Sequence, residues 1–421
     1  MDPIAIEKAY ALSREKYADL GVDTDKAISR LQSVPLSIHC WQGDDVGGFE
    51  PSAAGLNGSG LQVTGSYPGK ARNVQELRSD LHQAFALIPG RHRLNLHAMY
   101  GEFGGKPVER NEIEPGHFRG WVEWAKQEGL KLDFNATCFA HPKAAAGFTL
   151  SSKDPGIRRF WIDHVRLCRK IAAYLGRELQ ASSIHNLWIP DGSKDVPVDR
   201  WTYRALLKKS LDEIFETEYS PLQMKDSLES KLFGIGSESF VVGSHEFYLG
   251  YAFTKGKLVC LDLGHFHPTE SVADKISAVL QFSDEILLHV SRGVRWDSDH
   301  VVLLNDDIRA LAEEIVRGQA LDRTHIALDY FDASMNRVGA WVLGARATLR
   351  GLLIALLEPR ETLQELDGEG RVLARLAALE ELKSMPFGPV WDYFCLKNGV
   401  PPADFWLREI EAYEKKVLSK R

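Results

Sequence analysis

Short runs of apolar, β-prone residues alternate along the chain with longer segments in which apolar residues recur at helical spacing. The β-prone runs, which we expect to form strands, lie at residues 35–41, 93–100, 130–139, 182–190, 223–231, 258–266, 285–292 and 325–332. Between them lie amphipathic segments such as 72–88, 116–128, 155–177, 198–217, 271–284 and 305–318. Strands that alternate with segments long enough for a crossover helix are typical of parallel sheets. Eight such units predict an α/β fold, a closed (β/α)₈ TIM barrel.

The barrel pattern leaves additional α-helical segments at both ends of the chain. We expect an N-terminal helical segment at 1–34, the catalytic barrel at 35–358 and a C-terminal extension at 359–421 with a helical pattern throughout. In the extension, leucines such as Leu366, Leu373 and Leu376 recur at helical spacing among charged residues. This pattern indicates an accessory packing or subunit-contact segment without chemistry of its own.

One connection lacks any periodic pattern. Residues 43–70 contain eight glycines and join the first predicted strand to its helix. Connections longer than about 12–15 residues in a compact domain are usually functional loops or disordered. Because such a loop would lie over the mouth of the barrel, we favour a substrate-covering role over a merely flexible insertion.

Composition and charge narrow the function classes. The chain has 421 residues, 44% of them hydrophobic and 26% charged, with a formal net charge of −7 and no cluster of basic residues. This balance argues against nucleic acid as a partner. The N-terminus lacks the apolar core of a signal peptide, and the longest aliphatic run, 352–357, is far too short to span a membrane. Five scattered cysteines without C-x-x-C spacing fit a reducing cytoplasm.

Charged and polar side chains gather where the last four predicted strands end. The set is Glu229 and Lys231, Asp262 and His265, His289 with Asp297 and Asp299 in the loop that follows, and Asp329. Carboxylates that share one rim repel one another unless cations compensate, and one lysine is too few. Mixed Asp, Glu and His ligation suits Mn²⁺, Mg²⁺, Co²⁺ or Zn²⁺, and seven potential ligands suffice for two divalent ions.

Each of these residues taken singly has an ordinary structural interpretation. His289 could be a core histidine with satisfied hydrogen bonds, and Asp297 and Asp299 could belong to a solvated loop. Their coincidence at one rim favours the metal site. Other polar or aromatic strand residues could line the same cavity or point outward: His39, His97, Asn135, Asn186, Trp41 and Trp188.

Long motifs at these positions resemble a known family. The stretches HCWQGDDVGGFE (39–50), YPGKARN (67–73), LNLHAMY (94–100), ESKLFGIG (229–236), LDLGHFHPTE (261–270), HVSRGVRWDSDHVVLL (289–304) and LDYFDASMNRVGAWVLG (328–344) are similar to L-rhamnose isomerase. The resemblance runs from the first helical segment to the end of the chain and is least distinctive in the C-terminal extension.

The resemblance implies a cytoplasmic, homotetrameric barrel, related to xylose isomerase, that uses two divalent ions, commonly Mn²⁺. By motif, one ion, often called structural, would be held by Glu229, Asp262, His289 and Asp329, and a second, catalytic ion by His265, Asp297 and Asp299. Lys231, His97 and Trp188 would contact the sugar. These roles come from the resemblance, whereas the pattern itself shows only a shared rim.

The expected activity is interconversion of L-rhamnose and L-rhamnulose, the first step of L-rhamnose catabolism. Because nearly every acid and histidine of the rim is assigned to a metal, no free base is left for an enediol, which favours a metal-assisted 1,2-hydride shift. We expect Asp297, Asp299 and His265 to position the catalytic ion, with Lys231 and Asp329 beside the reacting atoms. Isomerisation of L-mannose, L-lyxose or D-allose stays open, as does a barrel-type metal-dependent phosphodiesterase.

Overall fold

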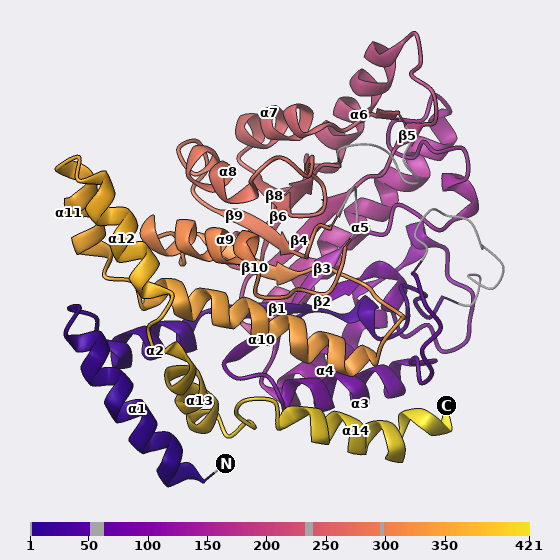
Figure 1. Ribbon diagram of the computed structural model, residues 1–421. Helices are drawn as coiled ribbons and strands as arrows, with labels where there is room; N and C mark the ends of the chain where they lie inside the picture. Colours follow the sequence, from indigo (N-terminus) through magenta and orange to yellow (C-terminus); the bar gives the residue numbers. More distant parts are fainter. Residues whose placement is uncertain (1, 51–62, 232–238, 295–298) are drawn as a thin grey trace.

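A computed structural model, which describes residues 2–50, 63–231, 239–294 and 299–421, shows a closed parallel barrel (Figure 1). Its strands follow one another around the barrel in the order β1-β10-β9-β8-β6-β4-β3-β2. Their bounds are β1 Pro35–His39, β2 Arg91–His97, β3 Lys131–Asn135, β4 Ser183–Trp188, β6 Met224–Glu229, β8 Leu258–Asp262, β9 Ile286–Val290 and β10 Thr324–Leu328. The predicted (β/α)₈ fold is confirmed, including the strand with the weakest pattern, β6.

Most strands end earlier than the sequence predicts. The run 130–139 forms only Lys131–Asn135, and Lys231 and Asp329 lie just beyond the last residues of β6 and β10. At these ends the chain leaves the ladder, so polar side chains can face the cavity without interrupting strand hydrogen bonds. A short antiparallel pair, β5 (Gly192–Ser193) with β7 (Phe240–Val241), was not predicted.

Helices cover the outside of the barrel (Figure 1). They are α3 Val74–Phe85, α4 Arg119–Glu128, α5 Pro155–Leu179, α6 Arg200–Ile214, α7 His245–Lys255, α8 Val272–Val279, α9 Asp306–Arg317 and α10 Arg337–Leu356. Several begin at an Asn or Asp side chain that accepts a first-turn N–H, as Asn73, Asp154 and Asn305 do. These caps explain where the amphipathic segments start.

Helix α10 is the one described helix that is long and apolar enough to cross a membrane. Within the protein, 78% of that apolar window is buried. The helix packs against α2 (Thr24–Ser33), α3 and α9. Its apolar character is therefore explained by packing in the core of the molecule.

The C-terminal extension is not helical throughout, contrary to the sequence prediction. It forms α11 Arg360–Gly368, α12 Val372–Leu382, α13 Phe387–Lys397 and α14 Trp406–Lys416. Pro386 lies in one break, and Pro401 with Pro402 in the next, because proline cannot continue a helix that precedes it. Helix α13 packs on α1 (Pro3–Ala18), whereas the α11–α12 hairpin projects from the barrel (Figure 1).

The glycine-rich connection after β1 is fixed where the structure describes it. The guanidinium of buried Arg110 pairs with Glu50 at 2.8 Å. Beyond the gap, the backbone N–H of Tyr67 donates to the carbonyl of Ala333. Residues 51–62 lie outside the described part of the chain, so the substrate-covering role of this loop stays a prediction.

Candidate metal centre and sugar pocket

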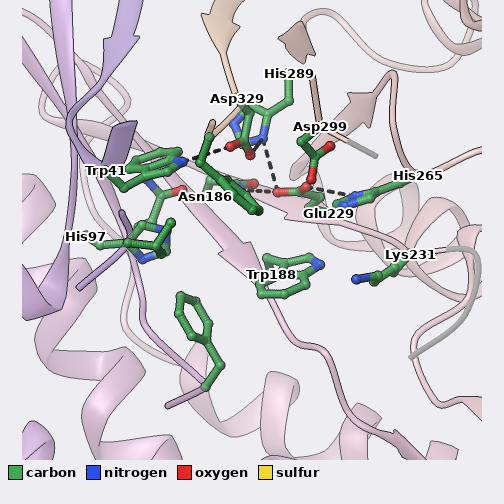
Figure 2. Close-up of a pocket in the computed structure, with 14 residues that line it drawn as sticks. Trp41, His97, Asn186, Trp188, Glu229, Lys231, His265, His289, Asp299 and Asp329 are labelled. Atoms are coloured by element: carbon green, nitrogen blue, oxygen red, sulfur yellow. Dashed lines mark hydrogen bonds and ion pairs between the residues drawn. The ribbon is translucent and has the colours of Figure 1, made fainter. Parts of the chain in front are cut away.

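A cavity of about 140 Å³ opens at the carboxyl ends of the barrel strands (Figure 2). This is the end at which TIM-barrel enzymes hold their active sites. Its lining comes from many strand ends and comprises Trp41, Val46, His97, Asn135, Phe139, Asn186, Trp188, Glu229, Lys231, His265, His289, Asp299, Asp329 and Phe331. All the predicted sugar contacts and most of the predicted ligands therefore lie in one cavity.

The first cluster unites four of the predicted ligands. Glu229, Asp262, His289 and Asp329 each offer one ligand atom, and these atoms lie within 4.8 Å of one another. Nδ1 of His289 is at their centre, 3.3 Å from Glu229, 3.6 Å from Asp262 and 3.0 Å from Asp329. The parallel register pairs Asp262 with His289, while Glu229 ends the neighbouring strand β6 and Asp329 directly follows β10.

The second cluster contains Asp262, His265 and Asp299, again within 4.8 Å. Asp262 is thus common to both clusters. The backbone at Gly264 lies between the two carboxylates, since a Cβ there would collide with Asp299 and crowd Asp262. Asp297, the other predicted ligand of this set, lies outside the described residues, and its role stays a prediction.

Burial and proximity shift the protonation of these groups strongly. Burial alone would lower the pKa of His265, but Asp262 and Glu229 outweigh it and raise that pKa to about 10. Burial would raise the pKa of Glu229, yet His289 and His265 hold it below its usual range. Burial raises the pKa of Asp262. In the protein alone, the charges on Glu229 and His265 therefore depend on each other.

This donor set fits a divalent cation. The Nδ1 atom of His289 can hold one proton, which cannot satisfy three carboxylates at once. Oδ2 of Asp262 is buried without a hydrogen-bond partner among the described residues. The sulfur of Cys260 also lies within 4.8 Å of ligand atoms of Glu229 and His289, but burial raises the pKa of its thiol and keeps it neutral. Carboxylate and imidazole ligands suit Mn²⁺, Mg²⁺, Co²⁺ or Zn²⁺.

Aromatic rings form the opposite wall of the cavity (Figure 2). Trp41 meets the ring of His97 edge-on at 4.8 Å, and Phe139 stands edge-on to both His97 and Trp188. Nζ of Lys231 lies 5.2 Å from the centre of the Trp188 ring. A polar cluster facing an aromatic wall suits a sugar, which has hydroxyl groups and C–H faces.

Two side chains that are not themselves ligands hydrogen-bond carboxylates of the first cluster. The amide of Asn186 donates to Oε2 of Glu229 at 2.5 Å, and the indole N–H of Trp41 donates to Oδ1 of Asp329 at 2.9 Å. From the sequence, Asn186 and Trp41 could face the cavity or point outward, and both line it. Phe139 and Phe331 line it too, although they were not predicted; their place near the end of a predicted strand is the one signal in the sequence.

The chain matches the family model of L-rhamnose isomerase (RhaA) over residues 4–421. Curated relatives named L-rhamnose isomerase, from Rhodopirellula baltica and Bacteroides thetaiotaomicron, are 56% and 55% identical to it over 416 residues. These alignments cover 99% of this chain and 97% and 99% of the relatives. A solved structure of L-ribulose 3-epimerase aligns with TM-score 0.46 at 13% identity, over 79% of this chain and 97% of that one. From the full-length match to the family model and the identity of these relatives, the chain belongs to the L-rhamnose isomerase family.

Proposed function

We propose that this protein interconverts L-rhamnose and L-rhamnulose, with two divalent ions held by the two clusters. The main support is structural: the two clusters share Asp262 and face an aromatic wall across one cavity. The chain is also about 55% identical to curated L-rhamnose isomerases. The first ion would bind Glu229, Asp262, His289 and Asp329. The second would bind His265 and Asp299, with Asp297 as a further ligand.

The side chains of the cavity have separable roles in this proposal. Divalent ions, when bound, would polarise the oxygens at C1 and C2 of the sugar. Lys231 would hold the negative charge that develops on an oxygen. Burial lowers the pKa of His97 to about 3, so the ring is neutral at pH 7 and can hydrogen-bond a sugar hydroxyl. Trp188 would pack against a C–H face.

We infer that hydrogen passes from C2 to C1 as hydride. An enediol route needs a base beside C2 with a free lone pair and a suitable pKa. The described acids and histidines at the rim, apart from His97, belong to the two clusters, and the low pKa of His97 makes it a poor base. Direct hydride transfer needs no base at the C2 hydrogen: the hydroxyl at C2 gives up its proton, and the oxygen at C1 takes one up.

Two assays test these proposals. Purified protein with Mn²⁺ should convert L-rhamnose to a ketose, and absence of ketose at high enzyme concentration would contradict the activity. Parallel assays with L-mannose, L-lyxose and D-allose define its breadth. In D₂O at low conversion, the product should carry little deuterium at C1, whereas substantial incorporation would favour the enediol.

The physiological metal and the assembly are part of the same proposal. We expect Mn²⁺ as the working ion, with Co²⁺, Zn²⁺ or Mg²⁺ as substitutes, since availability and geometry choose among them. We also propose a cytoplasmic homotetramer. All five cysteines are free and buried, as a reducing compartment favours.

A further inference from the structure

Asp329 lies beside the seam at which the barrel closes. Strands β1 and β10 pair over only two residue positions, and their last pair is Ser37 with Ala327. In contrast, β10 pairs with β9 over five positions, and the N–H of Asp329 continues this ladder by donating to the carbonyl of Val290 at 3.1 Å. The main chain therefore attaches Asp329 to β9, but not to β1.

Beyond the last backbone pair of β1 and β10, side chains at and after the end of β1 hydrogen-bond the segment that follows β10. The indole N–H of Trp41 donates to Oδ1 of Asp329 at 2.9 Å. The amide of Gln42 exchanges two hydrogen bonds with the backbone of Asp332, at 2.9 and 2.8 Å. Nε2 of His39 lies 2.5 Å from the carbonyl oxygen of Tyr330. Among these bonds, the one from Trp41 reaches a member of the first cluster.

The two oxygens of Asp329 consequently have different surroundings. Oδ1 accepts from Trp41, whereas Oδ2 lies 3.0 Å from Nδ1 of His289, inside the cluster (Figure 2). A carboxylate on a flexible loop could rotate and exchange its oxygens. The N–H of Trp41 selects one rotation and leaves Oδ2 directed at the space between the ligands.

Trp41 is itself closely packed. Its side chain is buried and packs edge-on against His97 at 4.8 Å and tilted against His39 at 5.2 Å. Little side-chain entropy is therefore lost when its N–H holds Asp329. Hydrogen bonds from outside a metal site that orient its ligands typically change metal affinity or activity about 10–100-fold.

We propose that Trp41 is a positioning residue for the metal centre: its indole N–H fixes Asp329 across the barrel seam and thereby increases the affinity of the first cluster for a divalent cation. This inference rests on the proposed metal dependence. Trp41 would thus both line the pocket and orient a metal ligand.

Titration of metal-free protein with Mn²⁺, without sugar, tests this role. Trp41→Phe keeps a ring but removes the N–H, and should raise the Mn²⁺ dissociation constant of the first cluster about 10–100-fold. Trp391→Phe is the matched control, because Trp391 is buried in α13, does not line the cavity, and has an indole nitrogen without a hydrogen-bond partner among the described residues. It should leave Mn²⁺ affinity near the parent value. An equal affinity in Trp41→Phe and Trp391→Phe would overturn the proposal.

A double-mutant cycle separates positioning from packing. In an Asp329→Ala background the oxygen that accepts from Trp41 and the ligand to be positioned are both gone, so Trp41→Phe should weaken Mn²⁺ binding no further. If Trp41→Phe costs the same factor in both backgrounds, it acts through packing and the proposal fails. Failure of the parent protein to convert L-rhamnose would contradict the proposed function, yet leave this affinity result as it stands.

Discussion

His289 is the side chain on which the first cluster depends most directly. Its Nδ1 lies within 3.6 Å of three carboxylates. We expect His289→Gln to retain fewer Mn²⁺ ions per chain after dialysis, because the change removes the imidazole ligand at the centre of the first cluster. Metal analysis checks this. His82→Gln, at an exposed position on α3, is the control, and equal metal content in the two variants would contradict the assignment.

Lys231 lies just beyond the end of β6, and its Nζ is 5.2 Å from the centre of the Trp188 ring. If it stabilises a developing oxyanion, Lys231→Met should lower kcat about 10²–10³-fold, as loss of one such donor does elsewhere. Metal content should stay unchanged. The control is Lys225→Met, on the same strand but paired with Glu285 away from the cavity. A kcat for Lys231→Met near that of Lys225→Met would exclude this role.

Helix α5 is held to strand β6 by a buried ion pair. Nε and Nη2 of Arg169 donate to Asp226, each at 2.9 Å, and His185 and Lys257 contact the same carboxylate. Removing one partner leaves a buried charge uncompensated, so Asp226→Ala should lower the free energy of unfolding by about 3–5 kcal/mol. Urea denaturation measures it.

An exposed pair on the same helix is the control for this change. Arg159 and Asp163 are paired at 3.7 Å with half and more than a third of their side chains exposed. Asp163→Ala should cost at most about 0.5 kcal/mol. A cost for Asp226→Ala that is no larger would show that the pair does not hold α5 to the barrel.

Glu285, just before β9, contacts Lys225 of β6 and His325 of β10, both at 2.6 Å. Chiefly through the His325 hydrogen bond, its pKa falls from 4.5 to about 2. A carboxyl with a lowered pKa stabilises the folded state above about pH 4.5 and loses this effect as the pH falls toward 2. Parent protein should therefore exceed Glu285→Gln in stability at pH 6, by a margin that shrinks between pH 4.5 and 2. A margin independent of pH would contradict this.

The pattern of strand and helix periods was sufficient to predict this barrel and the rim where its polar residues meet. It could not predict where each strand stops, because the β-prone runs continue past the residues at which the barrel strands end, as beyond Glu229 in β6 and Leu328 in β10. Nor could it predict that Trp41 bonds Asp329, since the two are 288 residues apart and meet only when the barrel closes. Prolines mark the breaks after α12 and α13, whereas Glu369-Gly370-Arg371 separate α11 from α12 without one, and leucines at helical spacing continue across that break.

Helix α12 bears on the state of the whole molecule. None of its described residues is buried, and Val372, Leu373 and Leu376 are 54%, 82% and 52% exposed. A projecting hairpin with such a face is typical of subunit contacts.

If four copies of this 47.2 kDa chain assemble through α12, charged side chains placed in that face must lose their hydration on association. Leu373→Glu with Leu376→Glu should therefore yield smaller particles by light scattering, with the circular dichroism of the barrel retained. Leu222→Glu, at an 83% exposed position before β6, should keep the parent mass, and an unchanged mass in the double variant would exclude α12 from the interface.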